Sequence, residues 1–181
     1  MRIPQIALIG PNDQGCTPEQ YHFGEALGRA LARRNLTLVC GGRGGWMEAV
    51  CKGAKSAPEA RPGQTVGILP DTEAALANPY CDIVIPTAIG FARNSIVVNS
   101  GDLVIAAGGG AGTLSELAFA WHYAKPVICY TGFGGWSAEL AGRTLDAHRP
   151  GRLLAADSME TLLHLLDDWL AARLSTTNPG T

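Results

Sequence analysis

Short, continuously apolar runs alternate with amphipathic helical patterns along nearly the whole chain, and this alternation constrains the fold more than any other feature. The runs cover residues 5–9, 36–40, 65–69, 83–85, 103–107 and 127–130, with a weaker one at 153–155. Strands that are apolar on both faces are typical of a parallel sheet covered by helices on each side. We therefore predict an α/β fold, a Rossmann-like three-layer sandwich with a mostly parallel sheet.

Helix signals fill the intervals between these runs. Thr17, followed by Pro18 and Gln20, predicts a capped helix start. Asp157 and Glu160 predict a capping pair for the final helix. The apolar face of that helix comprises Leu162, Leu166, Trp169 and Leu170. The other helices are expected over residues 46–55, 72–77, 91–99 and 113–123.

The length and composition favour one domain. A chain of 181 residues with 46% hydrophobic content can bury a continuous core, so we expect a single Rossmann-like domain over residues 1–174. The segment 175–181 is expected to be a disordered tail. A net charge of −2 gives no electrostatic footprint for nucleic acid or an anionic membrane. We read no signal peptide and no membrane anchor, and we expect a cytoplasmic protein.

The cysteines are scattered along the chain, at Cys16, Cys40, Cys51, Cys81 and Cys129. They form no CxxC pair and have no accompanying histidine at the spacing of a zinc site. We interpret them as reduced, small apolar residues, and we expect no protein-ligated metal.

A glycine-rich loop, residues 108–112, joins an apolar strand to a predicted helix. The free amides and the positive end of the helix dipole would then face an approaching anion, so the loop predicts a phosphate site. Glycine permits close approach of the backbone and the φ values that such loops need. A tight turn without a ligand is the alternative.

The loop does not match the common nucleotide fingerprints. Its spacing lacks the third glycine of the dinucleotide motif, and the next strand ends at Tyr130 and Thr131 without an acid to hold a ribose. No Gly-Lys-Ser/Thr sequence follows, as a Walker loop would require. We therefore expect neither NAD nor a nucleoside triphosphate at this loop.

Two charged side chains accompany the loop. Glu116 lies three residues after Thr113, a spacing that fits a capping box as well as a catalytic carboxylate facing the ligand. Arg93 can return to the same edge of the sheet as a phosphate or carboxylate partner, or it can be a solvated surface arginine. A second glycine cluster, residues 41–45 with Arg43 at its tip, fits either a further ligand contact or a plain turn.

These segments together resemble one family. Gly-Gly-Arg-Gly-Gly-Trp-Met-Glu at residues 41–48, Ala-Arg-Asn at 92–94 and Gly-Gly-Ala-Gly-Thr-Leu-Ser-Glu at 109–116, followed by Lys-Pro-Val at 125–127, are similar to the Lonely Guy (LOG/SLOG) superfamily. The resemblance extends from Ile6 to about Tyr130, and its nearest branch is that of the molybdenum cofactor carriers.

The resemblance implies roles for particular residues. In the cytokinin-activating enzymes of the superfamily, an Arg and a Glu act on the N-glycosidic bond of a nucleoside 5′-monophosphate while the glycine loop holds the phosphate. The positions that match are Arg93 and Glu116. Those enzymes usually have Pro-Gly-Gly-x-Gly-Thr and a Lys after the Arg, whereas this chain has Ala107 to Gly109 before the matching stretch and Asn94 at the Lys position. Both departures resemble the carrier branch.

The leading expectation is therefore a carrier-like protein that binds the molybdenum cofactor as cargo, and the alternative is a phosphoribohydrolase. The predicted ligand-binding residues are Gly41, Gly42, Arg43, Gly44, Arg93, Asn94, Gly108, Gly109, Gly110, Ala111, Gly112, Thr113 and Glu116. Arg93 and Glu116 are catalytic only in the hydrolase alternative.

Two further expectations accompany the resemblance. Superfamily members commonly pair, so a homo-oligomer is expected, and Trp121 and Tyr123 fit either its interface or the core. Similar chains are often called lysine decarboxylases, but Lys52, Lys55 and Lys125 have no recognisable Schiff-base setting. We therefore do not expect a pyridoxal phosphate enzyme.

Overall fold

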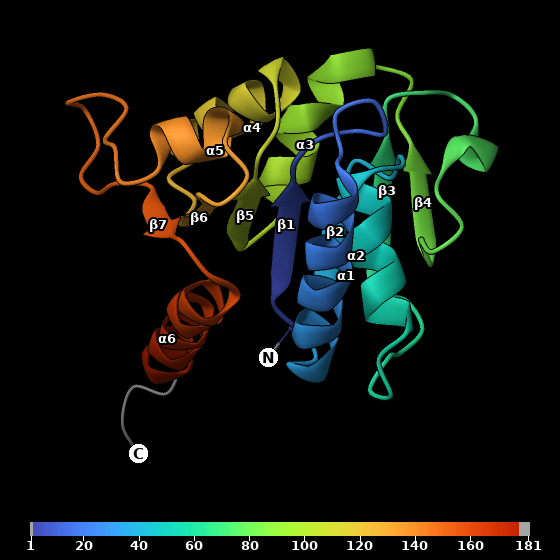
Figure 1. Cartoon of the computed structure of the whole chain (residues 1–181), viewed down its shortest axis with the longest axis horizontal. Helices are drawn as coiled ribbons and strands as arrows, with labels where there is room; N and C mark the ends of the chain where they lie inside the picture. The colour runs from blue at the N-terminus through green and yellow to red at the C-terminus, as the bar shows by residue number, and fades with distance from the viewer. Residues whose placement is uncertain (1, 178–181) are drawn as a thin grey trace.

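The structure, a computed structural model, describes residues 2–177, and its strands form one parallel sheet. The strand order is β4-β3-β2-β1-β5-β6-β7, with β7 and β4 at opposite ends of the sheet in Figure 1. The strands are β1 (Gln5–Ile9), β2 (Thr37–Cys40), β3 (Thr65–Leu69), β4 (Ile83–Pro86), β5 (Leu103–Ala107), β6 (Val127–Tyr130) and β7 (Leu154–Ala156). Every neighbouring pair is parallel, which confirms the predicted fold class.

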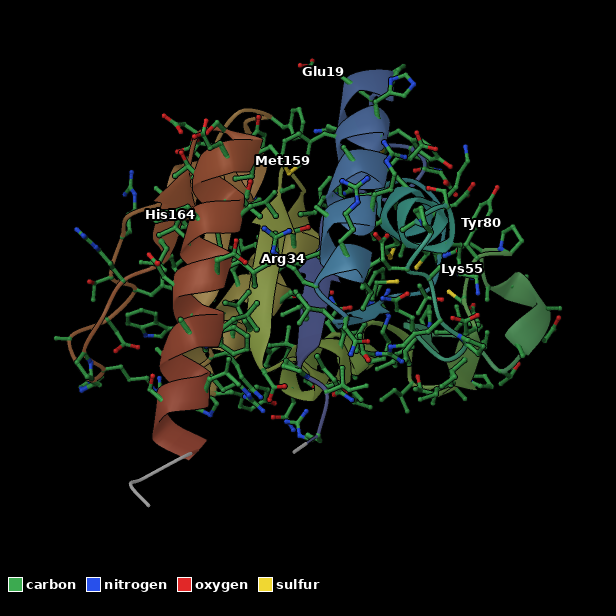
Figure 2. All side chains as sticks on the ribbon, turned by 90° about the horizontal axis from the view of Figure 1, so that it is seen from below. Glu19, Arg34, Lys55, Tyr80, Met159 and His164 are labelled. Atoms are coloured by element: carbon green, nitrogen blue, oxygen red, sulfur yellow. The ribbon has the colours of Figure 1, made fainter. Side chains whose placement is uncertain are left out.

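The helices lie in two layers, one on each face of the sheet. They are α1 (Pro18–Arg33), α2 (Trp46–Lys55), α3 (Arg93–Ser100), α4 (Ala111–His122), α5 (Gly135–Leu140) and α6 (Met159–Thr177), with short 3-10 turns η1 (Ala74–Leu76) and η2 (Gly90–Ala92). Side chains alternate along each strand, so Ile6 and Leu8 pack with α1, α2 and α6, whereas Ala7 and Ile9 pack with α3 and α4. Figure 2 shows α1 and α6 on the same side, with Glu19 near the start of α1 and Met159 at the start of α6.

The sheet has a switch point between β1 and β5. From β1 the chain builds outward through β2, β3 and β4, and it then returns to add β5, β6 and β7 on the other side. In parallel α/β sheets, ligands bind beyond the carboxyl ends of the strands at such a reversal. The loops that follow β1 and β5 therefore border the expected binding crevice.

Two helices on one face pack with their backbones close together. A Cβ atom on Gly28 of α1 would overlap the carbonyl oxygen of Val50, and one on Gly53 of α2 would overlap the carbonyl oxygen of Glu25. The predicted capping box at the start of α1 is also present, because Gln20 N donates to Thr17 Oγ1 at 3.2 Å and Thr17 N donates to Gln20 Oε1 at 2.8 Å. These contacts fix α1 and α2 beneath the loops that follow β1 and β2.

Several local predictions were wrong in part. The segment 72–77 forms only the short turn η1, and the helix expected from residue 91 begins as η2 and becomes α-helical at Arg93. No helix was predicted over residues 135–140, where α5 lies. Ser158, rather than Asp157, caps α6, because it directly precedes the helix and its Oγ accepts from Thr161 N at 3.1 Å.

The end of the chain also differs from expectation. α6 continues to Thr177, so residues 175–177 are helical and not part of a disordered tail. Residues 178–181, the rest of that predicted tail, lie outside the described residues. Between residues 2 and 177, no helix has the length and apolar character that crossing a membrane requires.

Candidate functional site

A cavity of about 750 Å³ opens at the carboxyl edge of the sheet, where the loops after β1 and β5 meet. Its volume is in the range of small-molecule sites, roughly 300–1,000 Å³. Of the predicted ligand-binding residues, those that line it are Arg43, Arg93, Asn94, Gly110, Ala111, Gly112, Thr113 and Glu116. The structure therefore brings the two glycine-rich segments and the Arg-Asn pair to one cavity.

The first turn of α4 faces this cavity without a side-chain cap. Gly110 is the N-cap residue, with φ −102°, and no side-chain cap hydrogen bond is present there. The first amides of a helix have no acceptor within the helix, and the helix dipole adds positive potential at this end. A Cβ atom on Gly110 or Gly112 would meet no heavy atom within 4 Å, so the space in front of these amides is open.

Gly108 and Gly109 do not line the cavity but give the loop its shape. Both have positive φ, +63° and +88°, in a region that favours glycine. Gly108 N donates to Ser137 Oγ at 2.6 Å, and Trp136 N donates to the carbonyl oxygen of Gly109 at 3.1 Å. These bonds tie the loop to the start of α5 and turn α4 toward the cavity.

Glu116 faces Arg93 and does not cap α4. Because α4 begins at Ala111, Thr113 already lies in its first turn, and the capping box, one of the two alternatives for Glu116, is absent. Instead, Arg93 Nη1 lies 3.4 Å from Glu116 Oε1, and both side chains are buried. Burial raises the pKa of Glu116 to about 8, although Arg93 opposes this shift, and burial lowers the pKa of Arg93. Glu116 is therefore mostly protonated near neutral pH.

Asn94 holds this pair in place from the next position along α3. Its Oδ1 accepts from Arg93 Nη1 at 2.5 Å, and its Nδ2 donates to Ser115 Oγ at 2.9 Å. Arg93 Nε is buried, and within the part of the chain that the structure describes it has no hydrogen-bond partner. The guanidinium is thus fixed at the cavity wall, and its buried Nε donor is unused.

The glycines of the second cluster pack against neighbouring segments and do not line the cavity. A Cβ atom on Gly41 would overlap Arg93 Nη2, and one on Gly44 would overlap the carboxylate of Asp13. Gly42 has φ +72° and lies against β3, while its carbonyl oxygen accepts from Asn78 N at 2.8 Å. Their contribution is close packing, and it is Gly41 that leaves room for the Arg93 guanidinium.

Arg43 reaches the cavity but is already paired. Its Nη2 lies 2.6 Å from Asp71 Oδ2, and its carbonyl oxygen accepts from Asn78 Nδ2 at 3.1 Å. The ion pair leaves much of the Arg43 charge compensated, because Asp71 lies beside it. Arg93 is therefore the cation best placed to act on a ligand in this cavity.

Sequence reasoning missed the loop between β1 and α1. Asn12, Asp13 and Gln14 are exposed and line the cavity. Met47, which is buried, and Phe91 also line it. Phe91 is 84% exposed despite its apolar ring. The available signal was the turn sequence directly after the first strand, because β1 is the strand at the switch point.

Comparisons with known proteins agree with this architecture. The model of the SLOG cluster4 family matches residues 3–163. A molybdenum cofactor binding protein from Rippkaea orientalis is 37% identical, with a TM-score of 0.81 over 94% of this chain and 99% of that one. The molybdenum cofactor carrier protein of Chlamydomonas reinhardtii is 32% identical, with a TM-score of 0.79 over 93% and 99% of the two chains. A cytokinin riboside 5′-monophosphate phosphoribohydrolase of Mycobacterium marinum is 29% identical over 81% of this chain and 84% of the relative.

Proposed function

The chain belongs to the SLOG cluster4 family, and from that premise we propose that it binds a phosphorylated, nucleotide-like small molecule at the carboxyl edge of the sheet. The proposed ligand is the molybdenum cofactor, held as cargo in the manner of a carrier protein. Its phosphate lies on the first turn of α4, and its metal arrives with the cofactor and not on protein ligands.

The observation that carries this proposal is the uncapped start of α4 inside a cavity of ligand size. Gly110, Ala111 and Gly112 are exposed there, and the glycines place no side chain between the backbone amides and an anion. An anion at a helix start gains hydrogen bonds from those amides and a favourable interaction with the dipole. A phosphate is the group that best matches several convergent amides.

The remainder of the cavity suits a heteroaromatic ring system. Phe91 and Met47 offer apolar contact, while Asn12 and Asp13 offer polar groups for the edge of a ring. This combination of apolar walls and a few polar groups is typical of small-molecule sites. A pterin and a purine share these properties, so the lining supports the ligand class and not one member of it.

The charges at the site favour a bound anion. Glu116, with a pKa of about 8, is mostly neutral at pH 7, so it does not repel a phosphate. Glu116 lies within hydrogen-bond reach of Arg93, and because its carboxyl group is mostly neutral, it does not cancel the positive charge of Arg93. Together with the dipole of α4, this charge supports phosphate binding in a chain whose net charge is −2.

Native mass spectrometry of the protein purified from its own host tests the proposal. We expect a mass increment that matches a phosphorylated pterin with molybdenum, and its absence in a folded Gly112→Val variant. Recovery of a nucleotide in its place, or of the same increment in the Gly112→Val variant, contradicts the proposal.

A second candidate function, a nucleoside 5′-monophosphate phosphoribohydrolase, is favoured by the buried Arg93–Glu116 pair. A carboxyl group that is protonated near neutral pH can act as a general acid toward a leaving base. Incubation with a panel of nucleoside 5′-monophosphates tests this function. Release of free base that is lost in Glu116→Gln, with ligand affinity retained, would replace the carrier function with the hydrolase.

We also propose that the protein acts in the cytoplasm as a homo-oligomer. Trp121 is buried and donates to Asp146 Oδ2 at 2.8 Å, which favours a core role, whereas Tyr123 is 38% exposed and remains available to an interface. The same native mass spectra report the assembly state. A monomer at micromolar concentration contradicts the oligomer.

A further inference from the structure

Three of the cysteines that are scattered in the sequence come together in the fold. Cys40 ends β2, Cys51 lies in α2, and Cys81 lies in the loop before β4. Their sulfur atoms all lie within 4.8 Å of one another, and the Cys40 and Cys51 sulfurs are 3.7 Å apart. Figure 2 labels Lys55 at the end of α2 and Tyr80 in the adjacent loop, the two segments that supply Cys51 and Cys81.

We call Cys40, Cys51 and Cys81 the thiol cluster. A metal ion bound there would have three sulfur ligands. Among residues 2–177, no histidine, aspartate, glutamate or fourth cysteine completes the group. The nearest carboxylate in sequence, on Asp82, is already used, because it accepts from Gln64 N at 2.9 Å and pairs with Lys55. Cys40 and Cys51 are fully buried, and Cys81 is half-buried.

The fold makes specific room for these sulfurs. A Cβ atom on Gly67 of β3 would lie 2.8 Å from Cys81 Sγ, so the glycine is what allows the Cys81 side chain to point inward. Gly42 N donates to Cys40 Sγ at 3.4 Å, so this sulfur already accepts a hydrogen bond from the backbone. Such a bond favours the thiolate over the thiol.

The spacing and number of the sulfurs select among metals. Metal–thiolate bonds of about 2.3 Å in a trigonal plane place the sulfurs about 4.0 Å apart, within the spread of this cluster. Structural zinc sites take four ligands and iron–sulfur clusters take four cysteines, so neither is complete here. Soft thiolates with no fourth partner favour a soft monovalent ion.

We propose that Cys40, Cys51 and Cys81 form a trigonal thiolate site for Cu(I). Binding forms three copper–sulfur bonds and releases the thiol protons to solvent, with no change in the oxidation state of the metal. Cys81 is the half-buried member, so the ion enters from its side. This site is separate from the cavity at α4 and does not depend on the proposed carrier function.

The electrostatics are consistent with a thiolate at the centre of the cluster. Hydrogen bonds with the Cys51 and Cys81 side chains lower the pKa of Cys40 well below its ordinary value, and Arg93 contributes in the same direction. The hydrogen bonds with Cys40 and burial raise the pKa of Cys51 and of Cys81, so these two thiols release their protons when the metal binds. Cys129 lies on the other face of the sheet, and burial raises its pKa to about 12. The chain thus offers a buried cysteine that is outside the cluster as a control.

Anaerobic titration of the full, reduced chain with Cu(I), in competition with a chromophoric Cu(I) chelator, tests the site. We expect one tightly bound ion per chain and affinity at least about 100-fold weaker in Cys81→Ser, which removes the half-buried ligand. Cys16→Ser and Cys129→Ala are matched controls that should keep wild-type affinity. Gly112→Val should also keep it, which separates this result from the phosphate site.

X-ray absorption of the loaded protein gives an independent reading, with three sulfur neighbours expected at about 2.3 Å. Unchanged affinity in Cys81→Ser, two sulfur neighbours, or weaker affinity in Cys16→Ser would overturn the proposal. If Cys81→Ser does not fold, as judged by circular dichroism, Cys40→Ser and Cys51→Ser give the same readout. Preference for Zn²⁺ over Cu(I) in the same competition would also overturn it.

Discussion

Replacing Gly112 by Val should remove phosphate binding while the protein still folds. Gly112 is the second residue of α4, it does not have positive φ, and a Cβ atom there would meet no heavy atom within 4 Å. Val is somewhat more favourable than Gly in a helix. We therefore expect the free energy of unfolding to change by less than about 1 kcal/mol, the usual range for an exposed site without strain.

The expected loss of affinity is much larger. The two γ-methyl groups of Val would lie in the open space before the amides of α4, where the phosphate oxygens bind. Hydrogen bonds to a charged group contribute roughly 1.5–3 kcal/mol each, so losing two of them costs about 3 kcal/mol or more. Because about 1.4 kcal/mol corresponds to a tenfold change, Kd should rise at least about 100-fold.

Calorimetry with a nucleoside 5′-monophosphate and the matched nucleoside measures this effect. Wild type should bind the nucleotide much more tightly than the nucleoside, and Gly112→Val should lose that difference. Ala118→Val is the matched control, since Ala118 is exposed on the same helix and does not line the cavity. A folded Gly112→Val protein with wild-type affinity for the nucleotide would refute the phosphate site.

Three further predictions follow from the buried contacts. The pKa of Glu116 is about 8 against an ordinary 4.5, so the folded state binds a proton that the unfolded chain releases, and thermal stability should fall as pH rises from about 4.5 to about 8. Glu116→Gln should flatten this part of the profile of melting temperature against pH, and an unchanged slope contradicts the assignment. Gly41→Ala should displace the Arg93 guanidinium and weaken nucleotide binding in calorimetry, because its Cβ would overlap Nη2. Gly28→Ala should lower the free energy of unfolding in urea titrations by about 1–3 kcal/mol, the range for overpacking, whereas an unchanged midpoint would show that α1 and α2 can separate freely.

The fold was predictable from the sequence because its strands are buried on both faces. Leu103–Ala107 is fully buried, as its unbroken apolar composition predicts, and its bounds match. By contrast, α5 has only six residues, and both its N-cap, Gly134, and its first residue, Gly135, have positive φ. It is held by long-range bonds such as that from Trp136 N to the Gly109 carbonyl oxygen, which no local pattern reveals.

The site was predictable only in part. The approach of Arg93 to Glu116 was one of two open alternatives, and the choice depends on where α4 begins, which is Ala111 and not Thr113. Gly41 and Gly44 pack against Arg93 and Asp13, which come from distant segments of the chain. The sequence alone therefore could not distinguish a packing role for these glycines from a ligand contact. The thiol cluster is likewise tertiary, because its cysteines lie on three separate segments that only the sheet order brings together.

The position of Asn94 bears directly on the choice between carrier and hydrolase. The cytokinin-activating enzymes that this chain resembles usually have a Lys at this position, and a Lys here would bring a further cation to the cavity. Asn94 instead uses both ends of its amide within the protein, on Arg93 and Ser115, and so it fixes the guanidinium without adding charge. With Glu116 mostly protonated at pH 7 and Arg43 paired with Asp71, Arg93 is the immobilised cation available to a ligand, beside an uncapped helix start. That arrangement stabilises the dianion of a phosphate group. A neutral Glu116 can donate a proton to a leaving base, but it offers no carboxylate charge to stabilise the positive charge that develops on the sugar in an oxocarbenium-like transition state, so the arrangement favours binding over cleavage.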